Sequence, residues 1–243
     1  MTDIHLAVAD GLAEIVCNRP GKKNAIARST IDALEDAVRT LQDSGAGALL
    51  LRGADHTFVA GGDLADLHAL PSDEALAVMD RMRAILQGFA DAPFPVVAYV
   101  EGDAVGGGVE IALAADLVLA QRDARFFLAQ VPMGLIPGWG GTTFLERRLG
   151  PARARALLLQ GARLSAEDAR AFGMVDGVVA DLGEARREAL HLASMPPAAV
   201  AAVKAITGRA PGDGRELFAS LWNSPDHGKR VERFLKRGRR DDG

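Results

Sequence analysis

The chain has 243 residues, of which 49% are apolar and 25% charged, a composition typical of globular proteins and not of disordered or fibrous ones. The formal net charge of -4 and a pI near 5.8 argue against a dedicated nucleic-acid-binding protein. The single cysteine, Cys17, excludes an internal disulfide. The N-terminal segment lacks a signal-peptide pattern, and no apolar run reaches the length of a membrane span. We therefore expect a cytoplasmic protein without nucleic-acid or membrane partners.

Strand and helix patterns alternate through the first hundred residues. Asp10-Gly11 separates two strand patterns and has the composition of a type I′ hairpin turn. Ser29 and Ser72 stand at the start of two amphipathic patterns and are the predicted N-caps. The expected elements are strands at 4–8 and 12–17, a helix from 29 that Ser44-Gly45 ends, a strand at 48–51, a helix from 72 that Pro93 ends, and a strand at 96–100.

The alternation continues to about residue 180, after which only helical patterns remain. Ser165 followed three residues later by Asp168 predicts a capped helix start. The expected elements are a short helix from the glycine run to about 115, a strand at 117–120, helices at 142–149, 151–160 and from 165, and a strand at 174–179. Alternating strands and helices predict an α/β fold with a mainly parallel sheet. We place a domain boundary between a core of residues 1–180 and a helical region of residues 181–243.

Several common active-site motifs are absent from the sequence. It contains no G-x-S-x-G elbow and no H-E-x-x-H motif, and its five histidines are scattered, so we expect no metal site. The glycine run at 106–108 is not a P-loop, because Gly108 and Val109 stand where Lys and Ser/Thr are required. It is not a dinucleotide-binding fingerprint either, because Ile111 occupies the third glycine position.

Two glycine-bearing segments each follow a predicted buried strand. They are Thr57–Leu64 and Glu101–Glu110. Successive glycines at a helix start are costly, so something must require the bare backbone. One interpretation is a site where main-chain N–H groups bind an anion or a developing oxyanion. The other is a tight turn between strand and helix that needs positive φ.

The sequence resembles the enoyl-CoA hydratase/isomerase (crotonase) superfamily over nearly its whole length. The motifs that carry the resemblance are Asn18-Arg19-Pro20-x-x-x-Asn24-Ala25, Phe58-x-Ala60-Gly61-x-Asp63-Leu64, Val105-Gly106-Gly107-Gly108-x-Glu110, Gly134-Leu135-Ile136-Pro137-Gly138-x-Gly140-Gly141 and Phe234. The resemblance implies a crotonase-like spiral of ββα units and a C-terminal helical oligomerisation region. It also implies a homotrimer, often a dimer of trimers, that acts on acyl-CoA in reactions such as those of fatty acid metabolism.

The resemblance also implies the residues that carry the chemistry. The N–H groups of Ala60 and Gly107 match the oxyanion hole that stabilises a thioester enolate. Glu110 matches a catalytic glutamate and is the expected acid/base. Gln130 stands where the family's hydratases have a second glutamate, and an amide cannot exchange protons near neutral pH. Gln130 is therefore expected to bond backbone, or to orient either a water or a substrate carboxylate.

Three functions remain open at this point. The first is a hydratase- or isomerase-like enzyme with one glutamate. The second is an alkylmalonyl-CoA-type decarboxylase, because Met133–Thr143, Arg215-Glu216-Leu217 and Leu221-Trp222 are similar to that branch, which also lacks the second glutamate. The third is a non-catalytic CoA-binding scaffold.

The family positions further imply contacts with coenzyme A, which enters as part of the substrate; no other cofactor is expected. The residues assigned to CoA are Lys22, Lys23, Ala60, Asp63, Leu64, Phe234 and Arg237. Leu64, Leu67 and Trp139 are candidate walls of the acyl pocket. Asp103 and Asp116 lie near the site in sequence, but a cap or an ion pair is the favoured role for both.

Overall fold

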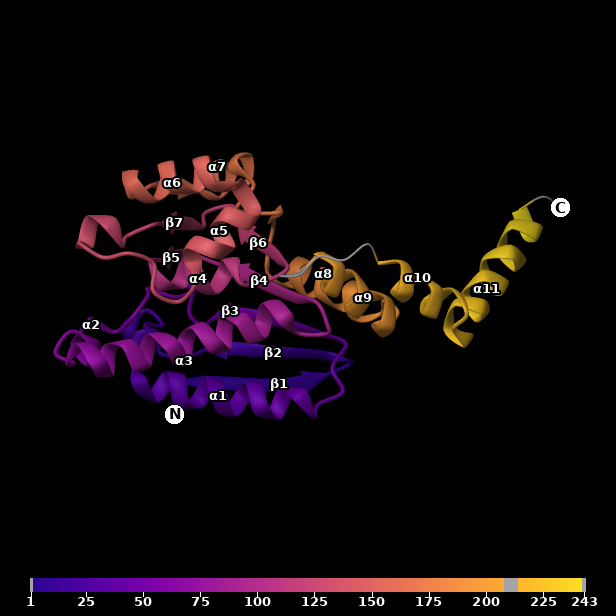
Figure 1. Cartoon of the computed structure of the whole chain (residues 1–243), viewed down its shortest axis with the longest axis horizontal. Coiled ribbons are helices and arrows are strands. Elements are labelled where there is room, and N and C mark those ends of the chain that lie inside the picture. Colours follow the sequence, from indigo (N-terminus) through magenta and orange to yellow (C-terminus); the bar gives the residue numbers. More distant parts are fainter. Residues whose placement is uncertain (1, 208–213, 242–243) are drawn as a thin grey trace.

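A twisted six-stranded sheet forms the centre of the computed structural model, which describes residues 2–207 and 214–241 (Figure 1). Its strand order is β1-β2-β3-β4-β6-β9, and only the β1–β2 hairpin is antiparallel. The strands are β1 (Ile4–Ala9), β2 (Leu12–Cys17), β3 (Ala48–Gly53), β4 (Val96–Val100), β6 (Leu117–Gln121) and β9 (Gly177–Val179). The predicted α/β class is confirmed. Asp10 and Gly11 both have positive φ, as the predicted type I′ turn requires.

A second sheet of three short strands was not predicted. It comprises β5 (Asp103–Val105), β7 (Arg125–Phe127) and β8 (Arg163–Ser165), in the order β5-β7-β8. Single bridges extend it toward the first glycine segment: Val59 pairs with Ala104, and Ile26 pairs with Gly62. The segment after β3 is therefore held between residues 23–26 on one side and β5 on the other.

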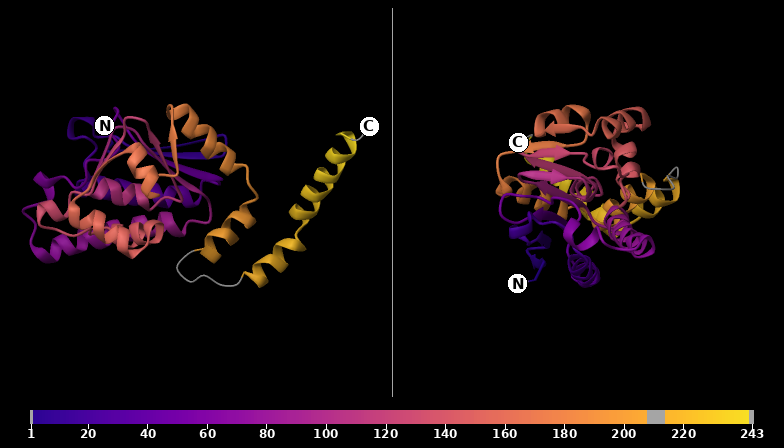
Figure 2. Two further views of the ribbon diagram at one scale, coloured as in Figure 1. Left: turned by 90° about the horizontal axis from the view of Figure 1, so that it is seen from above. Right: turned by 90° about the vertical axis from the view of Figure 1, so that its left-hand side faces the viewer.

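Helices cover both faces of the large sheet (Figures 1 and 2). Along β3, Leu49 and Leu51 face the larger core with α1 and α3, whereas Ala48 and Leu50 face a smaller core under α8. The helices of this part are α1 (Arg28–Gln42), α2 (Leu64–Leu67), α3 (Ser72–Asp91), α4 (Gly107–Leu113), α5 (Gly141–Leu149), α6 (Pro151–Gln160), α7 (Ala166–Phe172) and α8 (Leu182–Ala193), with 3₁₀ turns η1 (Pro20–Lys22) and η2 (Val131–Met133).

Of the three predicted N-caps, Ser165 is confirmed and Ser29 and Ser72 are wrong. Ser165 accepts from the Asp168 amide at 3.1 Å and donates to the Asp168 carboxylate at 2.7 Å, so the predicted capping box is confirmed. Ser29 is not an N-cap, because α1 begins one residue earlier and the Ser29 hydroxyl donates to Asp3 instead. Ser72 is the first helical residue of α3 and not its cap.

In the described part of the chain three helices follow α8, and the last two lead away from the sheets (Figures 1 and 2). They are α9 (Pro197–Thr207), α10 (Arg215–Trp222) and α11 (Pro225–Asp241), and we call α10 and α11 the arm. The predicted helical C-terminal region is confirmed. Its first helix, α8, packs against the large sheet, so the boundary at residue 180 stays a prediction. Among the described helices none alone has the length and hydropathy of a membrane span; α8 and α9 meet those criteria only together and are bent by 98°.

Candidate active site

Glu110 on α4 is a buried carboxylate whose oxygens are all held by N–H donors. Glu110 is only 4% exposed. Oε2 accepts from the backbone N–H groups of Trp139 at 2.8 Å and Gly141 at 2.7 Å, and Oε1 accepts from Gln130 Nε2 at 3.1 Å. A Cβ at Gly141 would lie 2.4 Å from Glu110 Cγ, so the glycine is needed for this approach. The start of α5 is therefore built around the carboxylate.

The protonation of Glu110 is set by burial opposed by these hydrogen bonds. Burial raises the pKa of the carboxyl above the ordinary glutamate range, and the bonds from Gly141, Trp139 and Gln130 lower it by less. In the part of the chain that the structure describes, Glu110 forms no ion pair with a basic residue. A carboxylate that has neutral donors and a raised pKa is suited to accept and release a proton.

Gln130 lies beside Glu110 at the start of η2 and is 9% exposed. Its Nε2 atom donates to Glu110, whereas its buried Oε1 atom has no hydrogen-bond partner in the structure. An unpaired acceptor is costly inside a protein unless a ligand or water supplies a donor. The amide therefore offers an acceptor to whatever binds next to Glu110.

The Ala60 amide is not available to a substrate. Its N–H donates to the Lys23 carbonyl at 3.1 Å, so the expectation that Ala60 forms half of an oxyanion hole is wrong. The next residues form a parallel bridge with Ile26. The Ile26 N–H donates to the Gly61 carbonyl, and the Asp63 N–H donates to the Ile26 carbonyl, both at 2.8 Å. In such a parallel bridge the N–H of the residue between them, Gly62, points to the opposite side, where β5 and α4 lie.

The Gly62 and Gly107 amides are one free N–H group in each glycine segment. Neither donates to an acceptor within residues 2–207 and 214–241. The segments approach closely, because a Cβ at Gly61 would lie 3.5 Å from the Gly107 nitrogen. Gly107 begins α4, and Glu110 follows it after one helical turn. The unpaired amides and the buried carboxylate thus belong to one site.

Each position of the 106–108 run requires glycine for a different reason. Gly106 has a φ of 53°, which favours glycine, so the tight-turn interpretation holds for this residue. A Cβ at Gly107 would lie 2.1 Å from the Trp139 indole, and a Cβ at Gly108 would lie 2.0 Å from the Val59 carbonyl oxygen. Close packing therefore requires the bare backbone at the other two positions.

Two of the three candidate pocket walls lie against the glycine segments. The Trp139 indole covers Gly107, and its Cζ2 atom lies 3.8 Å from the Cβ position of Gly62. Leu67 Cδ1 lies 2.9 Å from that same position. Leu64 is 61% exposed and stands outside this contact.

The residues assigned to CoA have different surroundings. One oxygen of the Asp63 carboxylate caps α2 at the Ala65 amide, and the other pairs with Arg19 at 3.1 Å. These bonds give Asp63 a role in the fold, and its assignment as a CoA contact stays a prediction. Lys22 and Lys23 are exposed on the turn whose carbonyl holds Ala60. The side chains of Phe234 and Arg237 lie outside the described residues.

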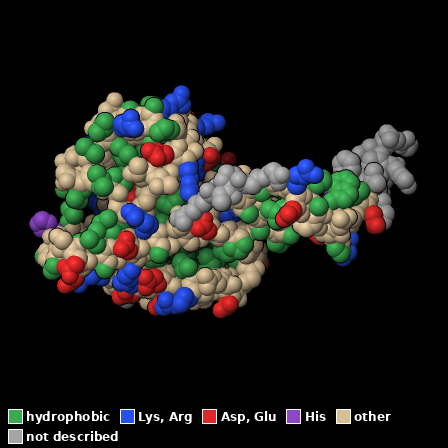
Figure 3. Space-filling model, viewed as in Figure 1, with side chains coloured by type: hydrophobic (Ala, Val, Ile, Leu, Met, Phe, Trp, Pro, Cys, Tyr) green, Lys and Arg blue, Asp and Glu red, His purple; other side chains and the backbone are tan. Residues whose placement is uncertain are grey.

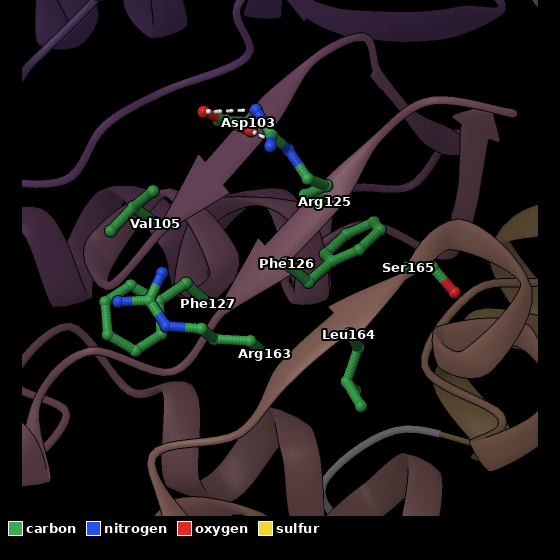
Figure 4. A pocket seen from close by; sticks show the side chains of 8 residues that line it. All are labelled: Asp103, Val105, Arg125, Phe126, Phe127, Arg163, Leu164 and Ser165. Atoms are coloured by element: carbon green, nitrogen blue, oxygen red, sulfur yellow. Dashed lines mark hydrogen bonds and ion pairs between the residues drawn. The ribbon is translucent and has the colours of Figure 1, made fainter.

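Asp103 and Asp116 have the structural roles that were favoured for them. Asp103 pairs with Arg125 across the small sheet, beside a hollow of about 370 Å³ in which Arg163 stacks on Phe127 at 3.6 Å (Figure 4). Asp116 accepts from the Val96 amide at 2.7 Å and from Lys204 at 2.5 Å, which fixes α9 to the core. Neither carboxylate reaches Glu110.

Comparison with known proteins identifies the family. The family model described as enoyl-CoA hydratase/isomerase matches residues 7–216, most of the chain. The chain belongs to the enoyl-CoA hydratase/isomerase family. It is 36% identical over 204 residues to a probable enoyl-CoA hydratase of Rhodobacter capsulatus, a match that covers 83% of this chain and 79% of that protein. It is 37% identical over 198 residues to the mitochondrial enoyl-CoA hydratase domain-containing protein 2 of Bos taurus, covering 79% of this chain and 67% of that protein.

Solved structures confirm the crotonase fold. An enoyl-CoA hydratase from Thermoplasma volcanium superposes with a TM-score of 0.91 at 25% identity, covering 96% of this chain and 97% of that one. One from Bacillus anthracis has a TM-score of 0.90 at 26% identity, with 97% and 96% covered. The resemblance read from the motifs is therefore confirmed at the level of family and fold.

Sequence reasoning missed two parts of this hydratase/isomerase-family site. It selected the Ala60 amide, whose N–H is bonded to Lys23, and overlooked the free amide of Gly62, because the direction of an N–H depends on the pairing with residues 23–26. It also treated Trp139 as a pocket wall alone and overlooked that its backbone N–H holds Glu110. The glycine spacing around Trp139 marked the loop, but nothing local indicated that bond.

Proposed function

We propose that the protein is an acyl-CoA-processing enzyme that stabilises a thioester enolate and uses Glu110 as its only acid/base. The observation that carries this proposal is the pair of free amides, Gly62 and Gly107, the second of which lies one helical turn before Glu110. This buried carboxylate has no cationic partner among the described residues. A thioester oxygen that accepts from both amides becomes negative as the enolate forms. Each donor of this kind contributes about 3 kcal/mol to the transition state.

Hydration of a 2-enoyl thioester needs only one carboxylate in this arrangement. The water oxygen bonds to the β-carbon, the double-bond electrons move onto the thioester oxygen at the two amides, and Glu110 takes a proton from the water. Glu110 then returns that proton to the α-carbon, so that H and OH are added in total. Isomerisation uses the same group, which removes a proton from the α-carbon and returns it to the γ-carbon.

Gln130 fits this chemistry better as a water-holding residue than as a partner of a substrate carboxylate. Its unpaired Oε1 is an acceptor, and a water has the donor that it lacks. A substrate carboxylate has only acceptors and would lie beside the Glu110 carboxylate. The unpaired acceptor of Gln130 therefore favours substrates without a free carboxylate, and so favours hydration and isomerisation over decarboxylation.

The proposal also covers the CoA contacts, the oligomeric state and the location of the enzyme. We propose that Lys22 and Lys23 pair with phosphates of CoA, because they are exposed on the turn that bonds the glycine segment. We also propose that the arm packs on a second copy in a trimer or a dimer of trimers. Phe218 and Trp222 of the arm are 64% and 60% exposed, and Figure 3 shows hydrophobic side chains on its surface. A cytoplasmic location remains part of the proposal.

The test is product analysis with three thioesters. Purified protein is incubated with crotonyl-CoA, a 3-enoyl-CoA and ethylmalonyl-CoA, and the products are separated by liquid chromatography. Mass identifies hydration and loss of CO₂, and the absorbance of the conjugated double bond identifies isomerisation, which leaves the mass unchanged. Hydrated or isomerised products support the proposal. Loss of CO₂ from ethylmalonyl-CoA alone would show a decarboxylase, and binding of CoA without any turnover would show a scaffold.

A further inference from the structure

The Trp139 indole lies across both segments whose amides are free. Its outer ring atoms Cζ3, Cη2 and Cε3 lie 2.1–2.6 Å from the position of a Cβ on Gly107, and Cζ2 lies 3.8 Å from that of Gly62. The ring is thus in van der Waals contact with one segment and close to the other. A thioester oxygen bound at the two amides would place its acyl carbons against this ring.

The ring is held firmly in this place. Trp139 is only 7% exposed, and its own N–H donates to Glu110 at 2.8 Å. The preceding residue, Gly138, is fixed by α3: its carbonyl accepts from Arg83 at 3.3 Å, and Met79 Cε lies 3.1 Å from its Cβ position. A side chain with these contacts cannot swing aside without breaking the packing of its loop.

The apolar face of the Trp139 indole determines which acyl groups can pack against it. An indole face is flat and apolar, so it favours a planar conjugated acyl group and offers nothing to a carboxylate or hydroxyl on that group. Leu67 borders the same position with a second apolar surface.

We propose that Trp139 is the specificity-determining wall of the acyl pocket and restricts the enzyme to short, unbranched, apolar 2-enoyl groups. This inference rests on the proposed function, since it assumes that a thioester binds at Gly62 and Gly107. It adds the acyl class and the residue that sets it.

The first experiment compares kcat/KM for crotonyl-CoA, 2-hexenoyl-CoA and 2-decenoyl-CoA in the wild type, Trp139→Ala, Trp139→Phe and Ile136→Ala. Ile136 is an apolar residue of the same loop that is 78% exposed, so its variant is the matched control. The wild type prefers crotonyl-CoA over 2-decenoyl-CoA. Trp139→Ala shifts this preference toward the long chain by about tenfold or more, Trp139→Phe shifts it less, and the control leaves it unchanged.

An unchanged preference in Trp139→Ala, or a wild type that processes both chain lengths equally, overturns the inference. Failure of the proposed function looks different, because the wild type would then turn over none of the three thioesters.

The second experiment does not depend on turnover or on the folding of a Trp139 variant. The chain has two tryptophans, and Trp222 is exposed on the arm, so Trp222→Phe leaves Trp139 as the only indole fluorophore. Butyryl-CoA changes the Trp139 emission beyond the change caused by CoA alone, whereas decanoyl-CoA binds more weakly than butyryl-CoA. Equal responses to CoA and butyryl-CoA would contradict contact between the acyl group and the ring.

Discussion

The surroundings of Asp63 and Glu110 differ, although both are buried acidic residues beside the glycine segments. Asp63 pairs with the Arg19 guanidinium and caps α2. Glu110 is held by two backbone amides and the amide of Gln130, with no cation paired to it among the described residues. Loss of the Asp63 carboxylate would leave the Arg19 guanidinium without this partner and α2 without its cap. A carboxylate with neutral donors can change its protonation, so the first serves the fold and the second is available for chemistry.

The largest effect is expected from Glu110→Gln, which changes the carboxylate that has only neutral donors. Turnover falls by about 10²–10⁴-fold, the usual contribution of a general acid/base. The fold is retained, because an amide oxygen at position 110 still accepts from Trp139 and Gly141, and its NH₂ group can donate to the free Oε1 of a rotated Gln130. Steady-state kinetics and the melting temperature measure the two effects. Wild-type turnover in this variant would show that Glu110 is not the acid/base.

Arg19→Met tests the other carboxylate. Arg19 bonds Asp63 and the Ala25 carbonyl and lies near Asp3, and its side chain is 18% exposed. Its loss leaves buried acceptors uncompensated and lowers the free energy of unfolding by about 3 kcal/mol, measured by urea denaturation. Arg28→Met is the matched control, because the Arg28–Asp66 pair lies at the surface and its loss is expected to change stability much less. Equal losses in both variants would contradict a structural role for the Asp63 pair.

Gln130→Met is expected to have a smaller and selective effect. The side-chain length is kept, but the donor to Glu110 and the free acceptor are both removed. Hydration of crotonyl-CoA falls by about tenfold, in line with one lost hydrogen bond, and more than isomerisation of a 3-enoyl-CoA, which needs no water. The ratio of the two rates is the readout. Equal losses would mean that Gln130 only supports Glu110 and does not hold the water.

The smallest expected effect is on the pH dependence of stability. Burial raises the pKa of Glu110 above its value in the unfolded chain. Its contribution to the free energy of unfolding is therefore fully present below the unfolded pKa and is lost as the pH rises through the raised native pKa. The stability of wild type relative to Glu110→Gln should fall as the pH rises above the ordinary glutamate pKa of about 4. A difference that does not change with pH would mean that the native pKa is not raised.

The features that could be predicted are fixed by neighbouring residues, although the caps expected at Ser29 and Ser72 are each one or two residues away from the observed ones. The hairpin turn at Asp10-Gly11 and the cap at Ser165 depend on adjacent residues, and both were predicted correctly. The small sheet was missed because each strand has three residues, too few for a recognisable alternation, and forms only against its partners.

The same limit applies to the site. The motifs located Glu110, Gln130 and both glycine segments. They did not distinguish Ala60 from Gly62, because that choice depends on the positive φ of Gly61 and on the bonds to residues 23–26.

The bond from Trp139 to Glu110 comes from the main chain, and this has an evolutionary consequence. Any amino acid except proline supplies the same N–H at position 139, so descendants of this protein can exchange the side chain there while Glu110, the proposed acid/base, keeps this bond. Position 141 has no such freedom, because any side chain there would collide with Glu110. Two neighbouring positions that hold the same carboxylate thus differ in how far they can diversify.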